Sequence, residues 1–128
     1  MALWDQMNIE QEVLAALGAL GQPSPLGRPF VTSYQLAMEL ERRAPQIRQA
    51  LNMPLGGRGS GRGRSMAQYL GRELSQRIRR GTLNQAIEGA FIADSDVVQI
   101  SYRRPDGTIL DSSVSGTGFD LALFRLRS

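Results

Sequence analysis

The sequence predicts an α+β fold, in which three N-terminal helices precede a small antiparallel β-sheet or hairpin. Up to residue 80, apolar residues recur at three- and four-residue spacing, which is the period of an amphipathic helix. Beyond that point, short runs rich in β-branched and aromatic residues alternate with turn residues. The chain has 128 residues, no cysteine and no apolar run long enough to cross a membrane, so we expect residues 1–128 to form a single cytoplasmic domain.

The first predicted helix spans residues 8–20. Asn8 and Gln11 have the spacing of a capping box at its start. Trp4, just upstream, is expected to pack back on the helix. The prolines and glycines of residues 21–29 oppose both helix and strand and predict a loop.

A short extended run at residues 29–33 leads into the second predicted helix. Thr32 and Gln35 form a second capping box. Pro45 should end or kink this helix, because proline lacks the N–H that a helix interior needs. Proline also suits the first turn of a helix, so a short further helix up to residue 51 stays open.

The third predicted helix begins at Ser65 and runs to about Arg80, with Gly81 in the helix-stop position. Ser65 and Gln68 make a third capping box. Gly71 in the middle of the helix costs about 1 kcal/mol relative to alanine, which the packing of the apolar face must offset. That buried face is expected to consist of Met66, Ala67, Leu70, Leu74 and Ile78.

The C-terminal part is predicted to be β-structure. Three runs have strand character: "VVQISYR" (97–103), "TILDSSV" (108–114) and "FDLALFRL" (119–126). "RPDGT" (104–108) is a turn, because proline presets φ and Asp-Gly tolerates positive φ, and "SGTG" (115–118) is the next turn. "AIEGAFI" (86–92) is either a strand paired with the following one through "ADSD" (93–96), or a short helix.

Positive charge is concentrated in one segment. All fifteen basic residues are arginine, and seven of them lie between Arg58 and Arg80 against one acid, Glu73. The rest of the chain holds eight arginines and eleven acids. Such a concentration is typical of a surface that faces a polyanion, although charges that only keep a protein in solution can also cluster.

The loop of residues 52–64 is expected to be flexible, because it contains five glycines. Its arginines and the outward face of the third helix have the chemistry of nucleic-acid recognition: arginine can fork onto guanine, glutamine onto adenine, and serine can hold phosphate. The positive end of the helix dipole should also attract phosphate. The predicted nucleic-acid-binding residues are Arg58, Arg62, Arg64, Gln68, Arg72, Ser75, Gln76, Arg79, Arg80, Arg103 and Arg104. An ordinary exposed helix face would be polar as well.

The order helix, short strand, helix, helix, strand, Pro-Asp-Gly turn, strand resembles that of a winged helix-turn-helix domain over about residues 9–114. The resemblance implies that the third helix enters the major groove of DNA, and that the hairpin tip "RRPDGT" (103–108) is the wing, which touches the backbone or minor groove. Residues 52–64 stand where the family has a short turn. The long final strand is an addition that could cover a sheet edge or build a homodimer.

These features together predict a nucleic-acid-binding protein: a small DNA-binding regulator or accessory protein of bacterial or phage type, with RNA as the other possible target. The alternative from another class is an interaction or assembly subunit that forms an oligomer without enzymatic activity.

Catalysis is not predicted. Without lysine or histidine the chain cannot form a Walker-type phosphate loop or a Ser-His-Asp triad. Asp94 and Asp96 with Asp111 or Asp120 could hold magnesium, but "ADSD" is better explained as a turn. No cofactor, metal or membrane partner is expected.

Overall fold

In the described part of the chain all helices lie between residues 3 and 80 and most of the strands follow them, so the fold class is α+β. The computed structural model describes residues 3–56, 65–84, 86–93, 95–97, 99–111 and 121–127. In chain order its elements are α1 (Leu3–Gln6), α2 (Ile9–Ala19), β1 (Val31–Thr32), α3 (Ser33–Arg43), α4 (Pro45–Leu51), α5 (Met66–Arg80), β2 (Ile87–Ile92), β3 (Ser101–Arg103), β4 (Ile109–Asp111) and β5 (Leu121–Leu126). None of the helices in these ranges is long and apolar enough to cross a membrane.

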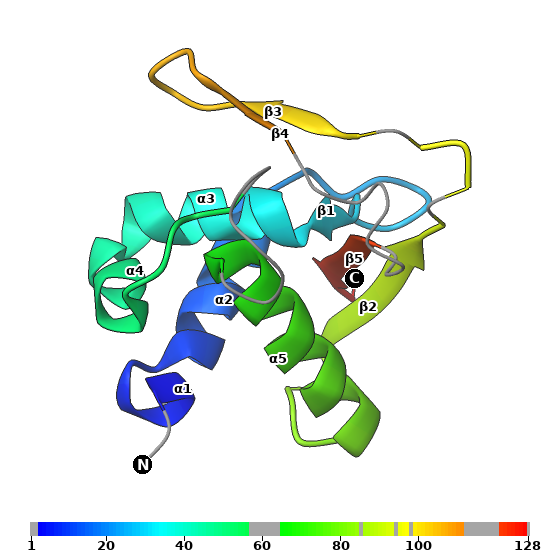
Figure 1. Cartoon of the computed structure of the whole chain (residues 1–128). Helices are drawn as coiled ribbons and strands as arrows, with labels where there is room; N and C mark the ends of the chain where they lie inside the picture. The colour runs from blue at the N-terminus through cyan, green and yellow to red at the C-terminus, as the bar shows by residue number, and fades with distance from the viewer. Residues whose placement is uncertain are drawn as a thin grey trace.

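The strands form two separate antiparallel sheets (Figure 1). The main sheet has the order β1-β5-β2, so that Phe124 lies opposite Val31 on one side and Gly89 on the other. β3 and β4 form a hairpin that the chain inserts between β2 and β5. The final strand, expected as an addition to the fold, is therefore the centre of the main sheet.

The segment 86–92 is a strand, which decides between its two predicted alternatives. The pairing expected for it, with the next strand through "ADSD", is wrong: β2 pairs with β5 over its whole length, from Ile87 opposite Leu126 to Ile92 opposite Leu121. The physical reason is burial, because this pairing puts Ile87 and Phe124 under α5, where both are almost fully buried.

The core lies between the helices and one face of the main sheet. Leu36 and Leu40 of α3 and Leu70 and Leu74 of α5 are fully buried there, next to Phe124 of β5. Burying a side chain of this size stabilises the folded chain by about 1.5 to 3 kcal/mol, so these contacts fix how α5 is held against the sheet.

Two of the three predicted helix starts are confirmed at the level of hydrogen bonds. The Thr32 hydroxyl accepts from the Gln35 N–H at 3.2 Å, and the Gln35 Oε1 accepts from the Thr32 N–H at 2.8 Å, which completes the capping box of α3. The Ser65 hydroxyl accepts from the Gln68 N–H at 3.1 Å at the start of α5, which confirms the serine half of the capping box predicted there. Pro45 ends α3 and stands in the first turn of α4, as expected.

The capping box predicted at Asn8 is wrong. Residues 3–6 already form the short helix α1, and the turn that leaves it puts Asn8 in the left-handed region, with φ of 52° and no side-chain capping bond. Asparagine tolerates this conformation well, so here it serves a turn between two helices. Trp4 of α1 is 3% exposed and packs into the core, as expected.

Candidate nucleic-acid interface

The buried face of α5 is the one predicted. Met66, Ala67, Leu70 and Leu74 are fully buried, and Ile78 packs against the core at its edge. Gly71 is buried as well, because α5 passes close to β5 at this point. The opposite side of α5 therefore faces away from the core, and it carries the binding residues predicted on this helix.

We define the α5 outer face as Gln68, Arg72, Ser75, Gln76, Arg79 and Arg80. Arg72, Arg79 and Arg80 are exposed, and the three shorter side chains are half-buried between them. The Arg72 guanidinium lies 6.0 Å from the centre of the Tyr69 ring. Within the described ranges, no carboxylate forms an ion pair with any of these three arginines.

Most of the other described arginines are neutralised inside the molecule. Glutamates pair with them as follows: Glu39 with Arg42 and Arg43, Glu41 with Arg48 and Arg104, Glu73 with Arg77, and Glu88 with Arg125 and Arg127. The three arginines of the α5 outer face, like Arg28 and Arg103, have no carboxylate partner among the described residues, which leaves their charge available to a ligand.

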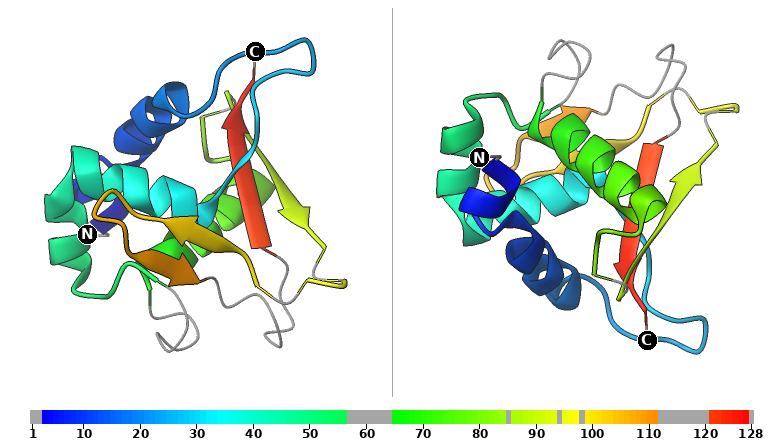
Figure 2. Two further views of the ribbon diagram at one scale, coloured as in Figure 1. Left: turned by 90° about the horizontal axis from the view of Figure 1, so that it is seen from above. Right: turned by 90° about the horizontal axis from the view of Figure 1, so that it is seen from below.

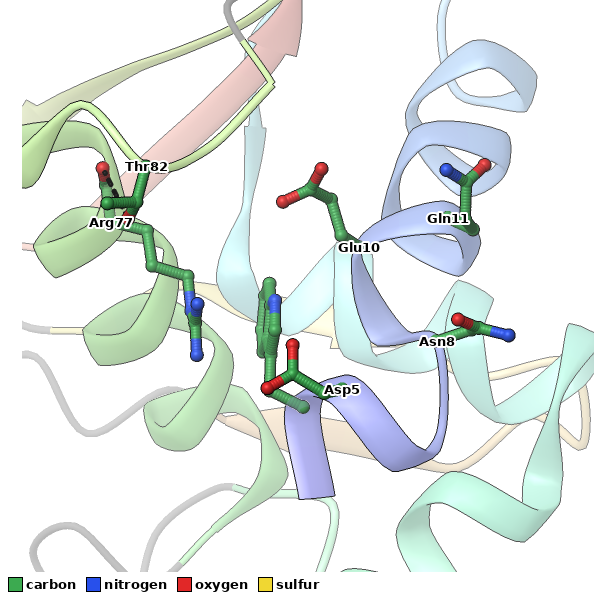
Figure 3. A pocket seen from close by; sticks show the side chains of 7 residues that line it. Asp5, Asn8, Glu10, Gln11, Arg77 and Thr82 are labelled. Carbon is green, nitrogen blue, oxygen red and sulfur yellow. Dashed lines mark hydrogen bonds between the residues drawn. The ribbon is translucent and has the colours of Figure 1, made fainter. Parts of the chain in front are cut away.

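Arg77 shows that position in the basic segment does not by itself make an arginine part of the interface. Its guanidinium lies 4.4 Å from the Trp4 ring centre, and its Nη2 is 3.3 Å from Glu73 Oε1. It borders a cleft of about 250 Å³ whose walls also carry the carboxylates of Asp5 and Glu10 (Figure 3). These acids oppose a phosphate at this side of α5, so Arg77 is a packing residue.

The start of α5 is not available to a phosphate, contrary to the expectation from its dipole. The N–H groups of Met66 and Ala67 donate to the carbonyls of Pro54 and Leu55 at 2.8 and 3.0 Å. The third N–H, that of Gln68, donates to Ser65. The donors that would hold an anion are used inside the protein.

The predicted turn 104–108 is confirmed at the tip of the β3–β4 hairpin. Arg104 donates its N–H to the Thr108 carbonyl at 2.8 Å, and the Gly107 N–H donates to the Arg104 carbonyl at 2.9 Å. Gly107 has φ of 89°, which glycine adopts without strain. The Asp106 carboxylate accepts from both the N–H and the hydroxyl of Thr108, and these bonds hold the pKa of Asp106 below its ordinary value.

This hairpin is fastened to α3. The rings of Tyr102 and Tyr34 stack at 5.5 Å between centres, and burial raises the pKa of Tyr102. Near the tip, Arg104 Nη2 lies 3.4 Å from Glu41 Oε2, while Arg48 Nε donates to the other oxygen of Glu41 at 2.6 Å. The charge of Arg104 is therefore shared with a carboxylate, whereas Arg103 is exposed.

The structure does not group the hairpin tip with the α5 outer face. Figure 1 and the two views of Figure 2 show the hairpin on one side of α3 and α5 on the other. Arg103 and Arg104 thus lie apart from the arginines of α5. Arg58, Arg62 and Arg64 of the predicted loop lie outside the described residues, as does the second predicted turn, 115–118.

Sequence reasoning missed one residue beside α5. Phe91 on β2 is 56% exposed, and its run was expected only to be a strand or a short helix, with no role for this side chain. No signal in the sequence marks it, because its exposure depends on where α5 crosses the sheet. The described residues contain no group of three or more acidic side chains suited to a metal ion, and Asp94 and Asp120 lie outside them.

Comparison of the chain with models of known protein families, with curated proteins and with solved structures found no match.

Proposed function

We propose that this protein binds nucleic acid through the α5 outer face, and that its partner is double-stranded DNA. The observation that carries the proposal is the free positive charge gathered on this face: among the described residues Arg72, Arg79 and Arg80 have no carboxylate partner, while seven other arginines share four glutamates. A binding surface for a polyanion needs such unpaired charge, because a paired guanidinium must first give up its carboxylate.

The side chains of the face suit both parts of DNA recognition. A guanidinium offers two parallel donors that match a phosphate or the O6 and N7 of guanine, and a glutamine such as Gln76 matches adenine. Ser75 between Arg72 and Arg79 supplies a further donor for a phosphate. α5 packs against the protein through its buried face, so its outer face is free to enter a groove as wide as the major groove.

The element order supports the same proposal. Helix α2, strand β1, helices α3 and α5, and then β3 and β4 on either side of the Pro-Asp-Gly turn follow the order on which the resemblance to winged helix-turn-helix domains is based, with α4 and β2 as additional elements. In that family the helix that follows the turn reads the major groove, which is the role proposed for α5. The hairpin tip is not part of the proposed interface, because Arg104 is bound to Glu41 on the other side of α3.

The test is the salt dependence of binding to a fluorescently labelled DNA duplex, followed by anisotropy. The variant Arg72→Ala with Arg79→Ala should bind more weakly. Its plot of log K against log salt should fall less steeply, by about 1.8 in slope, since each phosphate contact contributes about 0.9. A matched control is Arg42→Ala with Arg43→Ala, which removes the same charge from arginines that are paired with Glu39. Equal losses in both variants, or no binding by the unmodified protein, would refute the assignment.

One observation favours a second function, the assembly of several copies. β2 is an edge strand of the main sheet, and within the described residues no strand pairs with its outer side. An unpaired edge can add a strand from another chain. A stable oligomer in light scattering, together with no retention of the protein on heparin, would support assembly in place of DNA binding.

A further inference from the structure

Phe91 lies on the same face of the main sheet as α5. It is directly opposite Ala122 in the register of β2 and β5, so both side chains point to one side. A Cβ placed on Gly71 of α5 would lie 3.6 Å from the Ala122 Cβ, and one placed on Gly89 would lie 3.0 Å from Ile78 Cδ1. The stretch of α5 from Gly71 to Ile78 therefore runs beside Phe91.

The helix leaves this ring uncovered. Phe91 is 56% exposed, while Ala122 opposite it is buried. On the helix, Ser75 lies four residues after Gly71 and Arg79 lies four residues after Ser75, so these two side chains continue outward the row that begins at Gly71. The ring thus adjoins the α5 outer face on the side of its exposed arginines, and the acidic cleft beside Arg77 lies on the other flank of the helix.

We propose that Phe91 is a stacking platform for an unpaired nucleobase whose phosphates are held by the α5 outer face; this inference rests on the proposed function. An exposed aromatic ring next to unpaired guanidiniums is the combination that binds single-stranded nucleic acid, since the ring accepts the face of a base and the cations accept its phosphates. The preferred ligand is then DNA in which a duplex continues into a single-stranded segment.

Charge argues for a nucleic acid on this ring and against a second copy of the chain. Antiparallel pairing of two β2 edges around Phe91 would put α5 of both copies on the same side of the joined sheet, and their exposed arginines Arg72 and Arg79 would repel each other. A nucleic acid brings the opposite charge to the same place. Its base can stack on the Phe91 ring while its phosphates bind the guanidinium groups.

The experiment compares a blunt DNA duplex with the same duplex extended by a short single strand. Phe91→Ala should weaken binding of the extended duplex by roughly 5- to 150-fold and leave binding of the blunt duplex unchanged, because stacking on one aromatic ring contributes about 1 to 3 kcal/mol. Phe91→Leu keeps the apolar surface without the ring and should behave like Phe91→Ala. Ile109→Ala is the matched control, since Ile109 is 58% exposed but lies on the β3–β4 hairpin.

A direct readout comes from Phe91→Trp. The new indole should be quenched when the extended duplex binds, whereas the unmodified protein should show no change, because its Trp4 is buried under Arg77 on the other flank of α5. Equal binding of the extended duplex by Phe91→Ala and the unmodified protein would overturn this inference and leave the proposed function intact, provided that the Arg72 and Arg79 variant still loses affinity. A change of molecular mass caused by Phe91→Ala would also overturn it, in favour of an interface between copies.

Discussion

Gly71 inside α5 and Gly81 at its C-terminal end should respond to alanine substitution with opposite signs. Gly71 lies in the helix interior, where glycine is less favourable than alanine by about 1 kcal/mol. A Cβ on Gly71 would lie 3.6 Å from the Ala122 Cβ and from the Ser33 Cβ, which is ordinary van der Waals contact. The added methyl group therefore fits, and Gly71→Ala should raise the free energy of unfolding by about 1 kcal/mol.

Gly81 differs in its backbone and has free space around it. No atom lies within 4 Å of a Cβ on Gly81, but its φ is 73°, in the left-handed region that ends the helix. Alanine in that region costs roughly 1 to 2 kcal/mol. Gly81→Ala should accordingly lower the free energy of unfolding by about that amount.

Thermal unfolding followed by circular dichroism measures both effects. The unfolding entropy of a 128-residue chain is about 270 cal/mol/K at roughly 2.1 cal/mol/K per residue, so 1 kcal/mol corresponds to about 4 °C in Tm. We expect Gly71→Ala to melt about 4 °C higher than the unmodified protein, and Gly81→Ala about 4 to 8 °C lower. If Gly71→Ala melted several degrees lower, α5 would have to lie closer to β5 than described, and the reasoning would be refuted.

Three smaller effects complete the predictions. Thr32→Ala removes one half of the α3 capping box and should cost about 1 kcal/mol in urea denaturation. Burial raises the pKa of Tyr69 and Tyr102, so an absorbance titration should find both ionising above the ordinary value of 10.0. Because the folded chain then holds these protons more tightly than the unfolded chain, the free energy of unfolding should fall as the pH rises beyond 10. Thr108→Val removes a hydroxyl bond to Asp106 and should raise the pKa of that carboxyl in an NMR titration.

Each of these has a clear contrary result. An unchanged urea midpoint for Thr32→Ala would mean that the capping box adds nothing to α3. Tyrosines that all ionise at 10 would mean that the hairpin does not bury Tyr102 against α3 in solution. An Asp106 carboxyl that titrates alike in both proteins would mean that the hairpin tip is not held by Thr108.

Local signals in the sequence were sufficient for the limits of α3 and α5. The capping residues Thr32 and Ser65, the break at Pro45 and the stop at Gly81 act within one turn of the chain, so their neighbours in sequence are their partners in space. The amphipathic period of α5 likewise identified its buried side and, by exclusion, its outer face. The same logic failed at Asn8, because α1 packs into the core and changes the conformation that precedes α2.

Strand pairing and charge pairing could not be derived in this way. β2 pairs with β5 across the intervening hairpin, a choice that depends on which pairing buries Ile87 and Phe124 under α5. Arg104 pairs with Glu41, which is 63 positions away in the sequence, and no local pattern near either residue predicts this ion pair. The sequence could mark both as charged but could not say that they neutralise each other.

The sequence by itself determined the class of the fold, the limits of α5 and the concentration of arginine along one segment, because these follow from composition and from contacts between near neighbours. Only the tertiary structure decided which arginines keep a free charge. In the folded chain α3 lies between the hairpin and α5, and Arg77 contacts Trp4 and Glu73. Phe91 stays exposed beside the α5 outer face. The physical reason is that charge neutralisation and exposure depend on distances between residues far apart in the chain, and those distances are fixed when the core packs.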